Sequence, residues 1–118
     1  MDQLKIIKGE NFENIFKYTQ RKNDQEYDID ISTYDIVFEV IDPATGLQIL
    51  VEDTDFSLSR SVKNKGIIIL DMLATQTDAL DDDLSLGFYT LYIEDVTNDK
   101  RKLLKQGYIQ FLNWTRLP

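Results

Sequence analysis

The sequence is a series of short apolar segments separated by turn residues at intervals near ten residues. β-Branched residues dominate Asp35–Ile41, four aliphatic residues follow one another in Ile67–Leu70, and Asn11–Tyr18 places its aromatic residues at alternate positions. Segments of this length and composition are typical of β-strands, and the sequence contains no helical pattern long enough to connect parallel strands. We therefore predict seven or eight short strands in an antiparallel sandwich or barrel.

A turn sequence and one helical segment interrupt the predicted strands. Asp42–Gly46 contains a proline, which presets φ for a turn, and a glycine that can take a positive φ, so it predicts a hairpin. In Ala74–Leu80, Thr75 and Asp78 stand at capping-box spacing, which predicts a helix of one or two turns. The charge-rich segment Thr19–Glu26 is predicted to be a plain connection between strands.

The composition predicts one folded domain that spans residues 1–118. The chain is 42% hydrophobic and contains six Phe, six Tyr and one Trp, which is enough apolar material for a single core. No Gly/Ser-rich or Pro-rich stretch divides the chain, and nothing repeats at a fixed period. Because the sequence has no cysteine, the fold depends on packing without disulfides, which suits a reducing cytosol.

The residue types that are missing exclude several kinds of chemistry. Without His or Cys the chain has no Ser-His or Cys-His nucleophile system and lacks the usual proton shuttle near neutral pH. A carboxylate pair or a Ser-Lys arrangement remains as the alternative, and a carboxylate hydrolase would need one acid with a raised pKa. The acidic residues stand mostly beside turn residues, where water keeps them ionised, so we expect no enzymatic activity and no cofactor. The net charge of −8 disfavours nucleic acid as a partner. No segment has the length and apolar character of a membrane span, so we expect no membrane partner.

The basic residues are spread along the chain, with one cluster near the C-terminal third of the sequence. It consists of Lys100–Lys102, with Lys105 close behind. The cluster follows Asn98 and Asp99, a pair that favours a turn. We predict that it is the solvated end of a hairpin.

Two groups of acidic residues raise the question of a calcium site. Asp28, Asp30 and Ser32 place oxygens as in an EF-hand loop, but Thr33 stands where that loop needs glycine and a strand pattern follows. We expect these side chains to bond local backbone groups instead. The remaining candidate ligands are Asp53, Asp55, Asp82 and Asp83. Adjacent acids usually lie on solvated loops, so a metal site here is the weaker alternative.

Gly87 and Tyr89 follow the acidic run Asp81–Asp83 and begin a strand pattern in which Leu91 and Ile93 alternate. This order resembles the corner of an immunoglobulin-type sandwich, where a helical turn crosses between sheets and a tyrosine anchors the next strand. The tyrosine hydroxyl there bonds upstream backbone while its ring fills the edge of the core. We therefore predict structural roles for both residues and an immunoglobulin-like sandwich with one short helical turn.

Several short motifs, none of them specific alone, occur in an order that carries a family resemblance. They are Gly9–Phe12, Tyr27–Tyr34, Val40–Gly46, Thr75–Thr77 with Leu80, Gly87–Asp95, Leu103–Ile109 and Thr115–Arg116. In this order they resemble the small immunoglobulin-like structural proteins of tailed bacteriophages, a group that includes the amino-terminal domain of the baseplate upper protein. The best match is Leu103–Ile109, a leucine-rich strand that contains Gln-Gly.

The resemblance implies a virion component that is synthesised in the host cytoplasm and mounted on tail, baseplate, neck or capsid. Its implied partners are other virion proteins, and it would form a homo-oligomer in the particle. Exposed aromatic residues suit such interfaces. We name Trp114, Arg116 and Tyr108 as candidate contact residues. Trp114 has an alternative role, in which it covers the core of its own domain.

A carbohydrate-binding or receptor-binding β-sandwich is the alternative function. In that case exposed Tyr and Trp side chains would stack on sugars, and loop acids such as Asp53 and Asp55 would hold calcium. An oligomer that is unchanged by EDTA would favour assembly. A monomer that needs calcium to bind glycans would favour the alternative.

Overall fold

The computed structural model describes residues 2–113, and within them the chain is all-β, with ten strands and two short helices. The strands are β1 (Asp2–Ile7), β2 (Phe12–Lys17), β3 (Thr19–Lys22), β4 (Gln25–Asp28), β5 (Asp35–Ile41), β6 (Gln48–Leu50), β7 (Ser57–Ser59), β8 (Ile67–Met72), β9 (Leu86–Asp95) and β10 (Lys100–Leu112). The helices are the 3-10 turn η1 (Lys63–Lys65) and the α-helix α1 (Ala74–Asp78).

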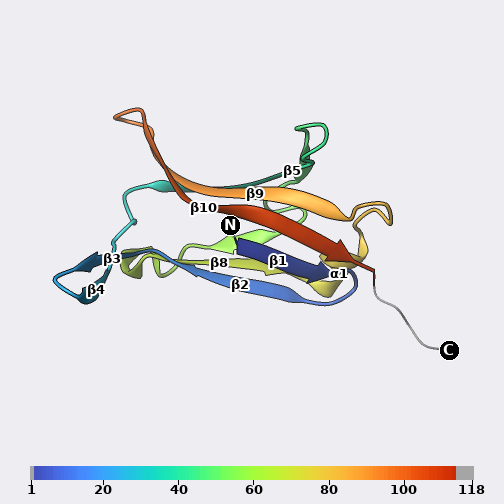
Figure 1. Cartoon of the computed structure of the whole chain (residues 1–118), viewed down its shortest axis with the longest axis horizontal. Helices are drawn as coiled ribbons and strands as arrows, with labels where there is room; N and C mark the ends of the chain where they lie inside the picture. The colour runs from blue at the N-terminus through green and yellow to red at the C-terminus, as the bar shows by residue number, and fades with distance from the viewer. Residues whose placement is uncertain (1, 114–118) are drawn as a thin grey trace.

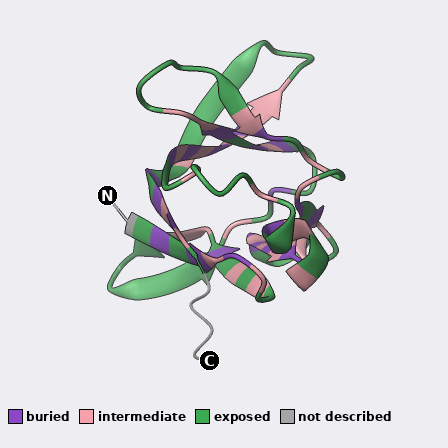
Figure 2. Ribbon diagram, turned by 90° about the vertical axis from the view of Figure 1, so that its right-hand side faces the viewer, coloured by how far each residue is buried: buried purple, intermediate pink, exposed green. Residues whose placement is uncertain are grey.

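Two sheets form the body of the molecule. One has five strands in the order β1-β10-β9-β5-β6, the other has three in the order β2-β8-β7, and the hairpin β3-β4 stands apart at one end (Figure 1). In β9 every second residue is buried, as in Tyr89, Leu91 and Ile93. Because side chains alternate across a strand, this pattern places one row of β9 between the sheets. Figure 2 shows buried and exposed residues alternating along the strands in the same way.

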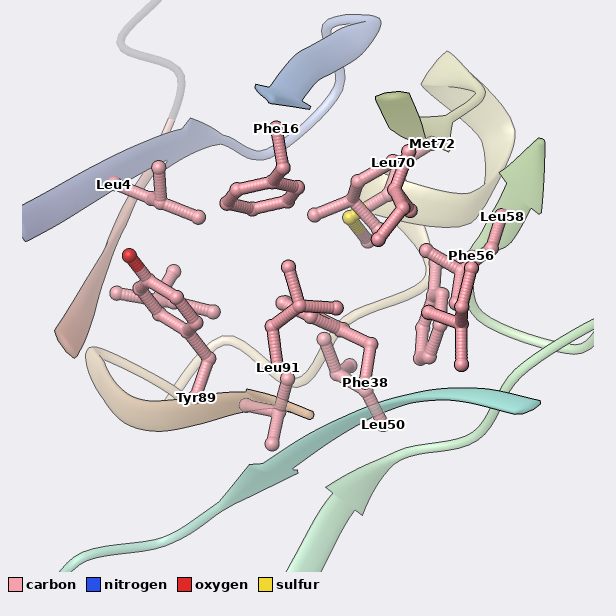
Figure 3. Packing of buried hydrophobic residues seen from close by; sticks show 14 of the residues in the cluster. Leu4, Phe16, Phe38, Leu50, Phe56, Leu58, Leu70, Met72, Tyr89 and Leu91 are labelled. Atoms are coloured by element: carbon pink, nitrogen blue, oxygen red, sulfur yellow. The ribbon is translucent and has the colours of Figure 1, made fainter. Parts of the chain in front are cut away.

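Aromatic side chains from both sheets meet in the core. The ring of Tyr89 on β9 is fully buried, 5.6 Å from the ring of Phe38 on β5 and 6.2 Å from that of Phe16 on β2. Phe38 also packs edge to face on Phe56 at 5.4 Å. Figure 3 shows these rings pointing toward one another together with Leu70 and Leu91. The apolar contacts that hold the two sheets together are therefore continuous across the core.

The prediction of a wholly antiparallel sandwich is wrong at one edge. β1 pairs with β10 in parallel, with Leu4 opposite Ile109. The chain turns sharply at Gly9, where φ is 92°, and leads into β2 of the other sheet, so β1 and β2 do not form a hairpin. The direction of β10 is set by its antiparallel pairing with β9. A local sequence pattern identifies strands but not their partners, and the parallel pair was missed for this reason.

The number of strands is ten within residues 2–113, where seven or eight were predicted. The segment Thr19–Glu26, predicted to be a plain connection, forms β3 and the start of β4. Between them Asn23 and Asp24 have φ values of 53° and 62°. Positive φ at both central residues is typical of a two-residue hairpin turn, and Asn and Asp tolerate it better than most residues. The Asn-Asp pair was therefore the signal for this hairpin.

The predicted short helix is confirmed, but the predicted capping box is wrong. α1 begins at Ala74, so Thr75 lies inside the helix. The side chain of Gln76 accepts a hydrogen bond from the Leu73 N–H at 2.9 Å, and Asn11 Oδ1 accepts one from the Ala74 N–H at 2.8 Å. A residue from the turn before β2 thus satisfies one of the free amides at the start of the helix, which no local motif reveals.

Candidate protein-interaction face

The side of the five-stranded sheet that points away from the core carries apolar and aromatic residues. We call it the outer face; on the central strands it includes Val37, Glu39, Ile41, Leu86, Phe88, Thr90, Tyr92, Gln106, Tyr108 and Gln110. Phe88 lies between Ile41 and Tyr108 in the strand register. The rings of Phe88 and Tyr108 meet edge to face with centroids 5.3 Å apart. Tyr108 is 40% exposed and Leu86 is 43% exposed, so apolar surface remains in contact with solvent.

Polar contacts fix the position of Tyr92 on the outer face. Its hydroxyl donates to Glu39 Oε1 at 2.9 Å, and the Arg101 guanidinium lies 5.6 Å from the centre of its ring. Arg101 also pairs with Glu94 at 3.4 Å. Burial and the nearby Glu39 carboxylate raise the pKa of Tyr92 to about 12. The phenol is therefore neutral at physiological pH and acts here as a hydrogen-bond donor.

The structure places one of the three predicted contact residues. Tyr108 lies on the outer face beside Phe88, in a position where another protein could cover it. Trp114 and Arg116 lie outside the described residues, so their predicted roles stay predictions.

The predicted corner residues both contribute to close packing. Gly87 is the second residue of β9, and a Cβ atom there would lie 3.0 Å from Val40 Cγ1 and 3.1 Å from Phe111 Cε2. Such contacts are tighter than side chains normally make, so the strand approaches its neighbours only because residue 87 has no side chain. Tyr89 is fully buried, with its hydroxyl end directed toward Leu4 (Figure 3). The predicted bond from that hydroxyl to upstream backbone stays a prediction.

The four acidic candidates for calcium ligands lie in two separate loops. Asp53 and Asp55 are in the connection from β6 to β7, and Asp82 and Asp83 are in the loop after α1. Asp55 Oδ2 accepts a hydrogen bond from the Val51 N–H at 2.8 Å, which is a local turn contact. Within residues 2–113, no group of three or more His, Cys, Asp or Glu side chains is arranged to hold a metal ion. The geometry therefore offers no support for a calcium site at these acids.

The segment that resembles an EF-hand loop bonds to itself, as predicted. Asp30 Oδ1 accepts hydrogen bonds from the Ser32 N–H at 2.9 Å and from the Ser32 hydroxyl at 2.5 Å. These two bonds hold the pKa of the Asp30 carboxyl below its usual value, because they stabilise its charged form.

A buried lysine, which the sequence did not reveal, holds the backbone of the acidic run in place. Lys8 is 6% exposed, and its ammonium donates to the carbonyl oxygens of Asp81 at 2.5 Å and of Asp82 at 3.2 Å. A buried cation needs hydrogen-bond acceptors and nearby negative charge. The run Asp81–Asp83 supplies the acceptors through the backbone carbonyls of Asp81 and Asp82, and this is a structural role.

The side chain of Thr77 on α1 also stabilises this region through hydrogen bonds. It is fully buried, its Oγ1 accepts from the Gly9 N–H at 3.0 Å, and the hydroxyl lies 2.8 Å from the Glu10 carbonyl and 3.1 Å from that of Ala74. Together, Lys8 and Thr77 join the turn between β1 and β2 to α1 and the loop that follows it. The sequence does not reveal either of these contacts, because the partners of both side chains are distant in the chain.

No protein-family model matches the chain, and a comparison with curated proteins finds no similar one. Among the described residues, no helix is both long enough and apolar enough to cross a membrane.

Proposed function

We propose that this chain is a non-enzymatic structural protein of a bacteriophage virion that acts by binding other proteins in the tail, baseplate, neck or capsid. The order of the sequence motifs suggests this class of protein. The observation that carries the proposal is the outer face, where Phe88 and Tyr108 present aromatic surface that the described part of the chain leaves exposed. A surface of this kind marks an interface more often than an isolated exposed residue does.

We further propose that the topology is immunoglobulin-like. We treat β3 and β4 as an insertion and letter the other eight strands A′, B, C, C′, D, E, F and G in chain order. The five-stranded sheet then has the order A′-G-F-C-C′, and the three-stranded sheet has the order B-E-D. The short helix α1 lies between the strands that correspond to E and F, and Gly87 and Tyr89 follow it at the start of F. β1 differs from the usual first strand because it joins the edge beside G rather than the edge beside B.

The outer face has the composition that an assembly interface requires. Phe88 and Tyr108 stand at its centre, with Ile41 beside them. Glu39 and Gln106 flank this group in the next row of the register. Interfaces commonly combine an apolar, aromatic centre with a polar rim, and a few aromatic residues contribute most of the binding free energy. We therefore assign Phe88 and Tyr108 as the anchor residues of the contact.

The proposal is tested by locating the protein in purified phage particles. We expect mass spectrometry to detect it as a stoichiometric component, and immunogold electron microscopy to label one defined part of the particle. Absence from purified particles would contradict the proposal. A calcium-dependent monomer that binds glycans would contradict it as well, in favour of a carbohydrate-binding module.

A pair of variants tests the outer face separately. Tyr108→Asp places a charge in the proposed interface and should reduce incorporation into particles at least tenfold, which corresponds to about 1.4 kcal/mol. The control is Ile15→Asp on β2, because Ile15 is 59% exposed and belongs to the other sheet. Equal incorporation of the two variants, with both folded, would exclude the outer face as the interface.

A further inference from the structure

Charge is distributed unevenly along the molecule, whose longest dimension is 55 Å. The turn between β9 and β10 and the hairpin β3-β4 lie at one end, and α1 with the loop after it lies at the other (Figure 1). Residues 17–35, 60–67 and 94–105 form the first end and its flank; they contain ten of the thirteen basic residues but only eight of the 21 acidic ones. We call this the basic end and the opposite one the acidic end.

A cleft opens at the basic end. One hollow of about 320 Å³ is lined by Tyr18, Tyr34, Ile93 and Lys102, among others, and an adjoining hollow of about 280 Å³ shares the last three and adds Lys100 and Arg101. Among the described residues that line these two hollows, none is acidic. The cleft therefore combines an apolar wall with three cations.

Two of these cations are available to a partner. The Lys102 ammonium lies 5.2 Å from the centre of the Tyr18 ring, which positions it at the cleft by a cation–π contact. Within residues 2–113 neither Lys100 nor Lys102 forms an ion pair, whereas Arg101 pairs with Glu94. Lys100 stands opposite Asp95 in the strand register and interacts with it electrostatically without forming an ion pair. An incoming carboxylate could therefore form a direct ion pair with either lysine.

The acidic end carries exposed carboxylates, whose charge is opposite to that of the cleft. Asp81, Asp82 and Asp83 are exposed, and none of their carboxylates forms an ion pair or an assigned hydrogen bond in the described part of the chain. Their backbone is held in place because Lys8 bonds the carbonyls of Asp81 and Asp82. The three carboxylates therefore project from a fixed loop, so little conformational entropy is lost when a partner binds them.

We propose that the basic cleft of one copy binds the loop Asp81–Asp83 of a second copy, so that copies associate head to tail. Two basic ends or two acidic ends would repel each other, so the charge pattern selects this orientation. A head-to-tail contact uses two different surfaces on each copy and therefore generates a ring if it closes, or a filament if it does not. This inference rests on the proposed role in assembly and specifies the contact between like subunits.

A charge-swap experiment on the full chain tests the contact. We expect sedimentation velocity to show at least a twofold higher average mass for the wild type in about 0.05 M salt than in about 0.5 M salt, because salt screens exposed charges. Lys100→Glu/Lys102→Glu and Asp82→Lys/Asp83→Lys should each remain monomeric in low salt. A mixture of the two variants should regain the higher mass, because the altered cleft of one then complements the altered loop of the other.

A control variant separates this contact from the effect of net charge. Glu13→Lys/Asp71→Lys changes the charge as much as Asp82→Lys/Asp83→Lys does, but replaces two acids that already stand opposite each other on β2 and β8. This control should associate like the wild type, and all variants should keep the thermal transition of a folded protein.

Three results would overturn the head-to-tail contact: a wild type that is monomeric in low salt, charge-reversed variants that associate like the wild type, or a mixture that stays monomeric. None of them bears on whether the protein is present in phage particles. A protein found in particles that fails the charge-swap test would keep the proposed function and lose this contact.

Discussion

At the acidic end, buried side chains hold neighbouring turns together, whereas at the basic end a glycine allows two segments of backbone to approach each other closely. Lys8 and Thr77 bond backbone groups of the β1–β2 turn, α1 and the acidic run. At the basic end Gly66 lies against the chain at Tyr18, whose N–H donates to the Gly66 carbonyl at 2.7 Å. The ion pair Lys17–Asp28 in the same region is exposed.

This difference shows that a high density of charged residues does not by itself mark the region where a charged residue stabilises the fold. The acidic run is held by one buried lysine. Most lysines and arginines of the basic end are exposed, apart from Arg60 and Lys63, which bond the carbonyls of Ile36 and Tyr34. Each end should therefore respond to a different kind of substitution, and the following variants test this from the largest expected effect to the smallest.

Gly66→Ala should produce the largest loss at the basic end. A Cβ atom there would collide with the carbonyl oxygen of Tyr18 and lie 2.7 Å from that of Ile29, at a φ of 70°. We expect the free energy of unfolding to fall by about 3 kcal/mol or more, from the left-handed conformation and the collision together. Gly46→Ala is the control in chemical denaturation, because its φ is 74° but nothing lies within 4 Å. Equal losses would show that the approach of Tyr18 is unimportant.

Lys8→Met should produce the largest loss at the acidic end. The substitution keeps the length of the side chain but removes its bonds to the Asp81 and Asp82 carbonyls, so we expect a loss of about 2 kcal/mol in the free energy of unfolding. Lys5→Met, at an exposed position of β1, should change it by less than about 0.5 kcal/mol. Equal urea-denaturation midpoints for the two variants would contradict the assignment of a structural role to Lys8.

Thr77→Val tests the second contact at the acidic end. The Gly9 N–H would lose its acceptor and the hydroxyl bonds would disappear, which should cost about 1 to 2 kcal/mol. Thr75→Val in the same helix replaces an exposed hydroxyl and is the matched control. Thermal unfolding of the two variants should show a clearly lower midpoint for Thr77→Val, and identical midpoints would contradict the assignment.

Tyr92 should respond to pH in a way that exposed tyrosines do not. Its pKa of about 12 lies above the usual value of about 10, so the fold favours the protonated phenol. The stabilisation is complete below about pH 10 and is lost as the pH rises toward 12. Glu39→Gln should lower this pKa, measured by ultraviolet absorbance with Tyr92→Phe to identify the signal. An unchanged titration would show that burial alone determines the shift.

Lys17→Ala should have the smallest effect. The side chains of Lys17 and Asp28 are 53% and 45% exposed at a separation of 3.2 Å, and exposed pairs of this kind contribute less than about 1 kcal/mol. We expect a change below about 0.5 kcal/mol in chemical denaturation. A loss as large as that of Lys8→Met would contradict the difference between the two ends.

The strands and turns were largely predictable because their signals are local. β5 has the predicted bounds, and the predicted turn at Asp42–Gly46 is confirmed by the bond from the Ala44 N–H to Asp42 Oδ1 at 2.8 Å. The hairpin β3-β4 was missed because its polar residues bury little surface and its only signal is the Asn-Asp turn. At the candidate interface, the alternation of side chains along β10 is enough to place Tyr108 and the buried Ile109 on opposite faces of the sheet.

The sequence by itself determined that the chain is all-β and which rows of side chains are apolar, since these depend on side-chain chemistry and a period of two along each strand. Only the tertiary structure decided that β1 pairs in parallel with β10. It also decided that Lys100, Arg101 and Lys102 line a cleft, and that backbone carbonyls of the acidic run bind a buried lysine. Lys8 and Asp81 are 73 positions apart in the chain, and no local pattern records which distant segments packing will bring together.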